Sequence, residues 1–265
     1  MHPTIVSTRS ETITTLRILN TRPAHQAEPL NQIIRTAGCV PIALPTLAIQ
    51  ALSTDWLTML PPLHTIQKAI FVSANAVHYF FTGLQIKQLV WPSTIQTFAI
   101  GSGTANALAQ HAVQNIQSPD VADSEHVLAL PALQSIQQES ILLISGKKGR
   151  PLLESSLRQR AAMVHHVSVY KRTVPKKNLP FTHALWQDNA VDIILMLSHE
   201  AIDNLFILFE EGARTWLQSK PWIVISPRLV EIAHSYHVTT VIYSEYADII
   251  TTLTRLMHDH GRNIS

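Results

Sequence analysis

The chain has 265 residues, of which 46% are hydrophobic and 14% are charged, and its 20 basic side chains barely outnumber its 18 acidic ones. This composition provides enough apolar surface for two compact domains and excludes a largely disordered chain. Dense basic stretches occur only at residues 147–150 and 171–172, which we interpret as solvated faces or local anion contacts, so a nucleic-acid partner is not expected.

Short β-branched apolar runs alternate with segments of helical period along most of the chain. The predicted strands, each followed by a helix, cover residues 16–20, 69–73, 97–101, 141–145, 192–197, 222–226 and 240–243. The predicted helices begin near Ala24, Asn75, Thr104, Arg150, Ser198, Pro227 and Glu245. This alternation is typical of an α/β protein with mainly parallel sheets flanked by helices.

Two segments interrupt this pattern and indicate how the domains are connected. Residues 40–49 carry two prolines in an extended apolar run, and residues 164–174 alternate apolar and polar side chains before Pro175. If these segments form a two-stranded extended connector, the first domain is discontinuous. We therefore expect an N-terminal extension at residues 1–15, a first domain at 16–40 plus 178–265, connectors at 41–49 and 164–177, and an inserted domain at 50–163.

A weak internal similarity indicates that the two domains are alike. Residues 71–77 and 195–202 both place a serine at the end of a strand and ahead of a helix, and residues 99–105 and 224–230 share a plan of the same kind.

Hydroxyl side chains mark the carboxyl ends of several predicted strands, where open α/β sheets bind their ligands. Taken singly, each is better explained as a helix N-cap, which contributes about 1 kcal/mol without any ligand. Taken together, they indicate a cleft that binds anions through neutral donors. These residues are Ser73, Ser102, Thr104, Ser198 and Ser226.

No cofactor or metal ion is expected. Gly101 and Gly103 lack the third glycine of a dinucleotide fingerprint, and the basic stretch after Gly146 lacks the Gly-Lys-Ser/Thr ending of a phosphate loop. The 14 histidines show no ligand spacing, and the adjacent His165 and His166 point to opposite faces of an extended segment. The sequence contains no Gly-x-Ser-x-Gly elbow, so a serine hydrolase is not indicated.

The chain is expected in the cytoplasm and away from membranes. Cys39 is the single cysteine, so no intrachain disulfide can form, and no apolar run is long enough to span a bilayer. The polar N-terminal residues contain no signal-peptide core.

In order and spacing, the motifs of this chain resemble those of bacterial uroporphyrinogen-III synthases from about Leu16 to Leu256. They are Asn-Thr-Arg-Pro at 20–23, Phe-Val-Ser at 71–73 with Ala-Val at 76–77, Trp-Pro at 91–92, Phe-Ala-Ile-Gly at 98–101 with Thr-Ala at 104–105, Leu-Ile-Ser-Gly at 143–146 with Gly-Arg at 149–150, Val-Tyr at 169–170 with Arg172, residues 192–198, Val224 with Ser226, Arg228 and Ala233, and Ala-Asp at 247–248. The chain departs from the family at Ser145, where Arg is frequent, and at Ala161 and His237, where Gly is usual.

The resemblance implies an enzyme that binds hydroxymethylbilane between two α/β domains and closes it to uroporphyrinogen III, with loss of water and inversion of ring D. On sequence context alone Tyr170 reads as an interfacial tyrosine, whereas the resemblance implies that it is the catalytic proton donor. The substrate-binding residues implied by the combined reading are Thr21, Arg22, Pro23, Ser73, Ala74, Asn75, Ser102, Thr104, Gly146, Ser198, His199, Ser226, Pro227 and Arg228.

The same resemblance implies a place in tetrapyrrole and heme biosynthesis, a monomer, and a substrate handed over by hydroxymethylbilane synthase. Two alternatives remain at this point. One is a catalytically silent two-domain paralogue that binds a small anionic ligand. The other is a solute-binding protein of the periplasmic type, which the missing signal peptide disfavours.

Overall fold

The computed structural model describes residues 15–147, 149 and 151–262 and divides them into two compact units. Unit 1 contains the described residues up to Ala48 and those from Val174 onwards, and unit 2 is Ile49–Thr173. Both boundaries fall within the segments expected to be connectors. The extension expected at residues 1–15 lies outside the described residues, apart from Thr15.

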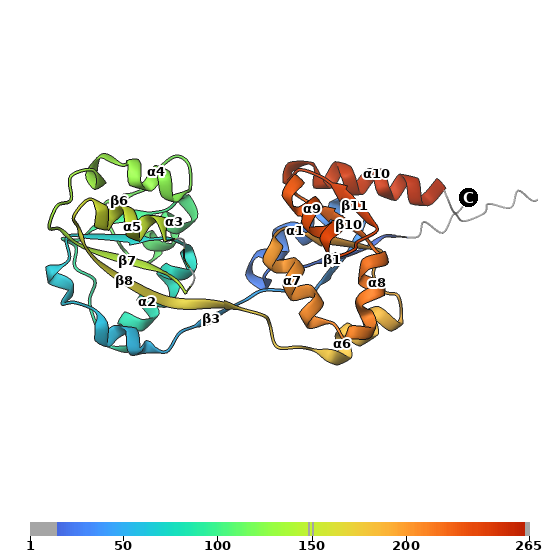
Figure 1. The fold of residues 1–265 in the computed structure, drawn as a ribbon, viewed down its shortest axis with the longest axis horizontal. Helices are drawn as coiled ribbons and strands as arrows, with labels where there is room; N and C mark the ends of the chain where they lie inside the picture. Colours follow the sequence, from blue (N-terminus) through green and yellow to red (C-terminus); the bar gives the residue numbers. More distant parts are fainter. Residues whose placement is uncertain (1–14, 148, 150, 263–265) are drawn as a thin grey trace, which may run out of the picture. The chain divides into compact units, whose positions relative to one another are not determined.

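Unit 1 is built on a five-stranded parallel sheet in the order β11-β10-β9-β1-β2 (Figure 1). Its strands are β1 (Arg17–Asn20), β2 (Val40–Ala43), β9 (Ile193–Met196), β10 (Pro221–Val224) and β11 (Thr240–Tyr243). Its helices are α1 (Ala24–Thr36), α6 (Leu179–Gln187), α7 (His199–Leu208), α8 (Arg214–Ser219), α9 (Pro227–Ser235) and α10 (Ile249–Arg262), with short 3-10 helices η4 (Glu211–Ala213) and η5 (Tyr246–Asp248).

Unit 2 is built on a six-stranded sheet in the order β3-β8-β7-β4-β5-β6. Its strands are β3 (Ala48–Ala51), β4 (Lys68–Phe71), β5 (Gln96–Ala99), β6 (Ile116–Gln117), β7 (Ser140–Gly146) and β8 (Met163–Thr173). Its helices are α2 (Ala74–Ile86), α3 (Ser102–Gln110), α4 (Ser124–Ala129) and α5 (Leu152–Gln159), with 3-10 helices η1 (Thr54–Met59), η2 (Leu63–Thr65) and η3 (Pro131–Leu133).

The segment at 164–177 is not a free connector for most of its length. β8 pairs in parallel with β7 from Met163 to Tyr170 and lies between β3 and β7 in the sheet (Figure 1). Its apolar positions Val164, Val167 and Val169 are buried, and this burial explains why the alternating pattern belongs to a strand of unit 2. The proline-containing segment at 40–43 is the edge strand β2, a position that tolerates Pro41.

Apolar side chains cover both faces of each sheet, as expected for parallel strands flanked by helices. In β7, Ile141 and Leu143 belong to one core cluster, while Leu142 and Ile144 belong to another on the opposite face. Unit 1 likewise has two clusters. The α/β class with mainly parallel sheets is therefore confirmed.

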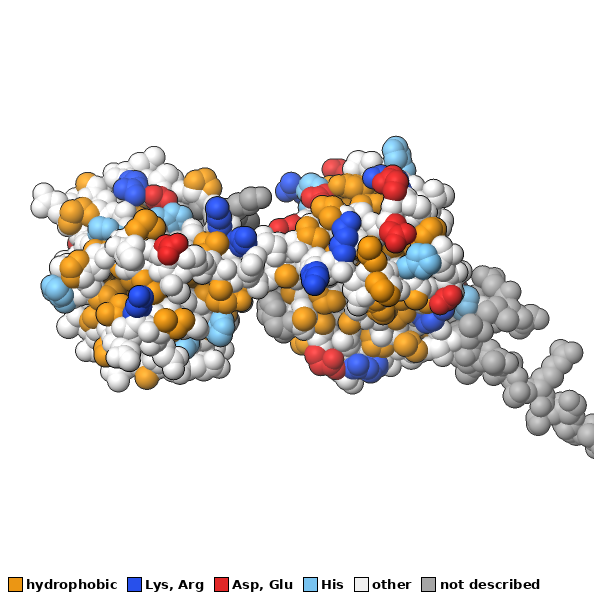
Figure 2. Space-filling view, turned by 90° about the horizontal axis from the view of Figure 1, so that it is seen from below, with side chains coloured by type: hydrophobic (Ala, Val, Ile, Leu, Met, Phe, Trp, Pro, Cys, Tyr) orange, Lys and Arg blue, Asp and Glu red, His pale blue; other side chains and the backbone are white. Residues whose placement is uncertain are grey.

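Charged side chains are sparse on the face shown in Figure 2, in agreement with their 14% share of the sequence. Within the described ranges, no helix combines the length and apolar character needed to cross a bilayer.

Candidate functional site

In unit 2, Ser73 and Tyr170 form a hydrogen-bonded pair at the carboxyl edge of the sheet. Ser73 follows β4 and is the N-cap of α2, where its Oγ accepts the Ala76 N–H at 3.0 Å. The Tyr170 hydroxyl lies 3.1 Å from the same Oγ. The predicted residues Ala74 and Asn75 form the first turn of α2.

The Tyr170 ring is packed against Gly146, at the end of the neighbouring strand. A Cβ added to Gly146 would lie 2.6 Å from two ring atoms, so only glycine fits beneath the ring. The other ring neighbour is Tyr79, at 6.0 Å between centroids. Tyr170 is 5% exposed, so its ring belongs to the core and its hydroxyl is held by Ser73. The sequence predicted Ser73, Gly146 and Tyr170 on separate grounds, and the structure places the first two in contact with the third.

The next strand end in this sheet supplies Ser102 and Thr104. Gly101 is the N-cap of α3, so the N-cap interpretation is wrong for Ser102 and Thr104, which are the first and third residues of the helix. Ser102 is exposed. Thr104 is only 4% exposed, so its side chain is largely covered by the protein.

In unit 1, two serines cap helices at adjacent strand ends. Ser198 follows β9 and accepts the Ala201 N–H at 3.2 Å, and Ser226 follows β10 and accepts the Leu229 N–H at 3.3 Å. The side chains next to them, His199, Pro227 and Arg228, are exposed. The N-cap reading of Ser73, Ser198 and Ser226 is thus confirmed.

The first strand end of unit 1 lies beside β9 and carries Thr21, Arg22 and Pro23. Thr21 is 2% exposed and donates its hydroxyl to the Leu195 carbonyl at 2.8 Å, so its side chain links two strands. Pro23 is the N-cap residue of α1. Arg22 is half-buried and is the charged residue among these three.

Tyr246 contacts Arg22 and was not predicted from the sequence. The Arg22 Nη1 donates to the Tyr246 hydroxyl at 3.3 Å, and the guanidinium carbon lies 5.2 Å from the ring centroid. The two residues are far apart in the chain, so only knowledge of which loops meet at this edge would reveal the contact. The cation–π geometry restrains the guanidinium group.

A second pair of contacts restrains His199. Its Nε2 lies 3.4 Å from Asp203 Oδ1, one turn further along α7. The same carboxylate accepts the Tyr236 hydroxyl at 2.6 Å, and this hydrogen bond raises the pKa of the Tyr236 phenol.

Metal ligation finds no support within the ranges the structure describes, where no group of three or more His, Cys, Asp or Glu side chains is placed to hold an ion. His165 and His166 bond to different serines, Ser140 and Ser145 respectively.

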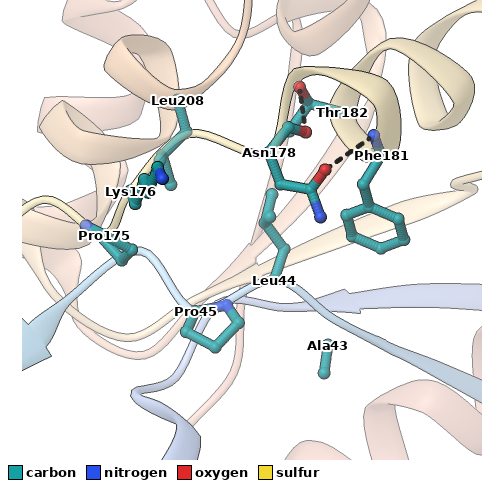
Figure 3. A pocket seen from close by; sticks show the side chains of 9 residues that line it. All are labelled: Ala43, Leu44, Pro45, Pro175, Lys176, Asn178, Phe181, Thr182 and Leu208. Carbon is teal, nitrogen blue, oxygen red and sulfur yellow. Dashed lines mark hydrogen bonds between the residues drawn. The ribbon is translucent and has the colours of Figure 1, made fainter.

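Unit 1 also contains a cavity of about 350 Å³ at the end of β2 and the start of α6 (Figure 3). Two of its polar side chains serve the helix terminus: Asn178 Oδ1 accepts the Phe181 N–H, and Thr182 Oγ1 donates to the Asn178 carbonyl. None of the predicted site residues lines it. The lining residues are Ala43, Leu44, Pro45, Pro175, Lys176, Asn178, Phe181, Thr182 and Leu208.

Comparison with known proteins gives consistent results. A family model described as "Uroporphyrinogen-III synthase HemD" matches residues 28–250. Uroporphyrinogen-III synthases of Salmonella typhimurium and Escherichia coli are each 30% identical over 223 residues, which cover 82% of this chain and 90% of theirs.

Two solved structures share the fold. A mutant uroporphyrinogen III synthase of Thermus thermophilus has a TM-score of 0.57 at 15% identity, with 95% of this chain and 100% of that chain covered. The Helicobacter pylori enzyme has a TM-score of 0.57 at 16% identity, with 93% and 99% covered.

Proposed function

The chain belongs to the uroporphyrinogen-III synthase family, and from this membership we propose that it performs the family's reaction with the strand-end residues described above. It is a cyclising hydro-lyase of tetrapyrrole biosynthesis: hydroxymethylbilane loses water and closes with ring D inverted, giving uroporphyrinogen III. The observation that carries the assignment of the site is the Tyr170–Ser73 hydrogen bond at the N-terminus of α2.

We assign substrate binding to neutral donors at the strand ends. The substrate carries eight carboxylates, so an acidic site would repel it, whereas a site made only of Lys and Arg would retain the product. Helix N-terminal amides and the helix-capping hydroxyls of Ser198 and Ser226 interact with carboxylates without this penalty. Arg22 and Arg228 provide the limited positive charge.

The hydrogen bond from Ser73 allows Tyr170 to act as an acid. Ser73 Oγ already accepts the Ala76 N–H, so the Ser73 proton is available for donation to the phenolic oxygen. Tyr170 then keeps its own proton for the departing hydroxyl of the substrate, which leaves as water. The Ser73 hydroxyl and the positive end of α2 stabilise the negative charge that develops on the phenolic oxygen.

The remaining chemistry belongs to the pyrroles. Loss of water leaves an azafulvene cation, which the substituted carbon of ring D attacks to form a spiro intermediate that fragments and closes again with the ring inverted. Free hydroxymethylbilane closes without inversion, so the main contribution of the protein is to hold the correct carbon near the cation.

The test is to incubate the purified protein with freshly prepared hydroxymethylbilane and to resolve the product isomers. The enzyme produces the type III isomer without added metal ion or nucleotide. Type I product alone would refute the proposal and would favour the silent paralogue, an alternative that the family and the relatives do not support.

We further propose that the protein acts as a cytoplasmic monomer and receives its substrate from hydroxymethylbilane synthase. The support is the family resemblance. Light scattering of the purified protein tests the monomer, and a coupled assay with excess inactive synthase as competitor tests the hand-over.

A further inference from the structure

Three side chains outside the residues assigned above form a hydrogen-bonded chain in unit 2. Ser145 Oγ lies 2.7 Å from His166 Nε2, and His166 Nδ1 lies 2.7 Å from Glu154 Oε2. They come from β7, β8 and α5 respectively. The order serine, histidine and carboxylate is that of a hydrolase triad.

Burial argues against a nucleophilic role for Ser145. The residue is 2% exposed, and Gly149 lies against its hydroxyl, since a Cβ added there would be 3.3 Å from Ser145 Oγ. A serine that attacks a substrate must be reachable by the electrophile. The hydrogen bonds among Ser145, His166 and Glu154 therefore do not serve a nucleophilic attack by Ser145.

The chain leads to the glycine that supports Tyr170. Besides His166, Ser145 Oγ has the Gly146 carbonyl within reach at 3.0 Å, and that carbonyl also accepts the Gly149 N–H at 3.1 Å. Gly146 lies directly beneath the Tyr170 ring, and the next amide, Lys147 N–H, donates to the Tyr170 carbonyl at 2.7 Å. A change in the hydrogen bonds of Gly146 therefore alters the packing beneath the Tyr170 ring.

Ser145 has one hydroxyl proton and two acceptors for it. When His166 is neutral and donates Nδ1–H to Glu154, its Nε2 accepts the serine proton. When His166 is protonated, Nε2 becomes a donor to Ser145 Oγ, and the serine proton turns to the Gly146 carbonyl. The protonation state of His166 thus decides whether Ser145 holds Gly146.

We propose that Glu154, His166 and Ser145 are positioning residues that fix Gly146 beneath Tyr170 when His166 is protonated. This inference rests on the proposed role of Tyr170.

The described contacts place one carboxylate and one guanidinium group of α5 near His166. Glu154 is its carboxylate partner on α5, and Arg158, one turn further along α5, donates to Glu154 Oε1 at 2.9 and 3.1 Å. The Arg158 hydrogen bonds keep the pKa of Glu154 below its usual range. On β7, the facing group is the uncharged Ser145.

The first test needs no activity. In NMR spectra recorded from about pH 5.5 to 8.5, the Gly146 carbonyl carbon should titrate with the same midpoint as the His166 ring. In Ser145→Ala the ring should still titrate, but the Gly146 carbonyl should not. A carbonyl that never follows the ring, or that still follows it in Ser145→Ala, would overturn the proposal.

The second test is the pH dependence of turnover at saturating hydroxymethylbilane. We expect kcat for the type III product to fall about threefold or more as pH rises through the His166 midpoint, with KM changed less than about twofold. Ser145→Ala and His166→Gln should lose this dependence and show the low plateau at all pH values.

His165→Gln is the matched control, because the adjacent histidine bonds to Ser140 at the other end of β7 and should leave the profile unchanged. Wild-type kinetics in Ser145→Ala, or labelling of Ser145 by a fluorophosphonate, would contradict the positioning role. Absence of type III product from the wild type would refute the proposed function and would leave the NMR test to decide the inference.

Discussion

Arg17 and Asp192 form the most completely paired ion pair described in unit 1. Asp192 accepts the backbone N–H of Arg17 at 2.7 Å and two guanidinium hydrogen bonds at 3.0 and 2.8 Å. Burial alone would raise the pKa of Asp192, but the hydrogen bonds from Arg17 outweigh it and hold the pKa below its usual range. The carboxylate thus ties the start of β1 to the residue before β9.

This pairing predicts a pH-dependent contribution to stability. A depressed carboxylate pKa adds stability above the unfolded-state pKa of about 3.9, and this contribution is lost as pH falls through the lower folded-state value. Asp192→Asn should lower the free energy of unfolding by about 1–2 kcal/mol at neutral pH.

Urea titrations of the wild type and Asp192→Asn at several pH values measure this difference. The gap should close below about pH 4. The exposed Asp120→Asn is the charge control and should show no comparable gap. A gap for Asp192→Asn that stays constant down to pH 3 would exclude the ion pair as its cause.

At the scale of elements, α2 is placed by an aromatic cluster that requires a glycine. Trp56 is 5% exposed and lies against Gly83, where an added Cβ would be 2.4 and 2.7 Å from two atoms of the indole ring. Trp56 also stacks on Phe80 at 5.3 Å between centroids. Because α2 carries Ser73 at its N-cap, this packing also positions the partner of Tyr170.

Two Gly→Ala substitutions should therefore have opposite effects. In α2, Gly83→Ala gains helix propensity but forces the indole ring to move, and should destabilise the protein by about 1 kcal/mol or more. In α3, Gly103→Ala meets no atom within 4 Å and should stabilise it by roughly 0.5 kcal/mol. Thermal unfolding measures both. Equal shifts of the same sign would contradict the packing argument.

Among the described residues, five helices are followed by a residue other than glycine in the left-handed conformation, and α5 and α9 are two of them. Ala161 follows α5 with φ 60°, and His237 follows α9 with φ 62°. Their amides donate to the Arg158 and His234 carbonyls at 2.9 Å. Glycine adopts this conformation without steric cost.

Ala161→Gly and His237→Gly should each stabilise the protein by about 1 kcal/mol, because left-handed backbone is unfavourable for side chains with a Cβ. Ala184→Gly, at an exposed position inside α6, is the control and should destabilise by a similar amount. Melting temperatures of the three variants decide the matter. A loss of stability in both Ala161→Gly and His237→Gly would contradict the argument from backbone strain.

At the scale of the whole molecule, the alternation of apolar runs and helical segments predicted the α/β class and the strand-end serines that cap α2, α7 and α9. These features could be predicted because they depend on local residue order. The sequence did not reveal that β8 is an inner strand, because an alternating pattern also fits an extended connector. The six-residue helices α4 and α8 carry too few turns for a clear helical period.

Side-chain partnerships were the least predictable features. Tyr246 reaches Arg22, and Ser145 reaches His166, only because the topology places their loops and strands together. Thr21 was predicted correctly to lie at a strand end, whereas Thr104 is the third residue of α3. Both are nearly buried, which their positions in the sequence do not show.

The account depends most on the hydroxyl group of Tyr170. Tyr170→Phe keeps the ring against Gly146 and should remain folded, as judged by circular dichroism and melting temperature. Tyr79→Phe is the control, since Tyr79 is the neighbouring ring and its hydroxyl donates to the Ile49 carbonyl. The decisive measurement is the rate of type III product formation from hydroxymethylbilane. We predict that Tyr170→Phe lowers it about tenfold or more while Tyr79→Phe does not, and a Tyr170→Phe rate within about twofold of the wild type would contradict the account.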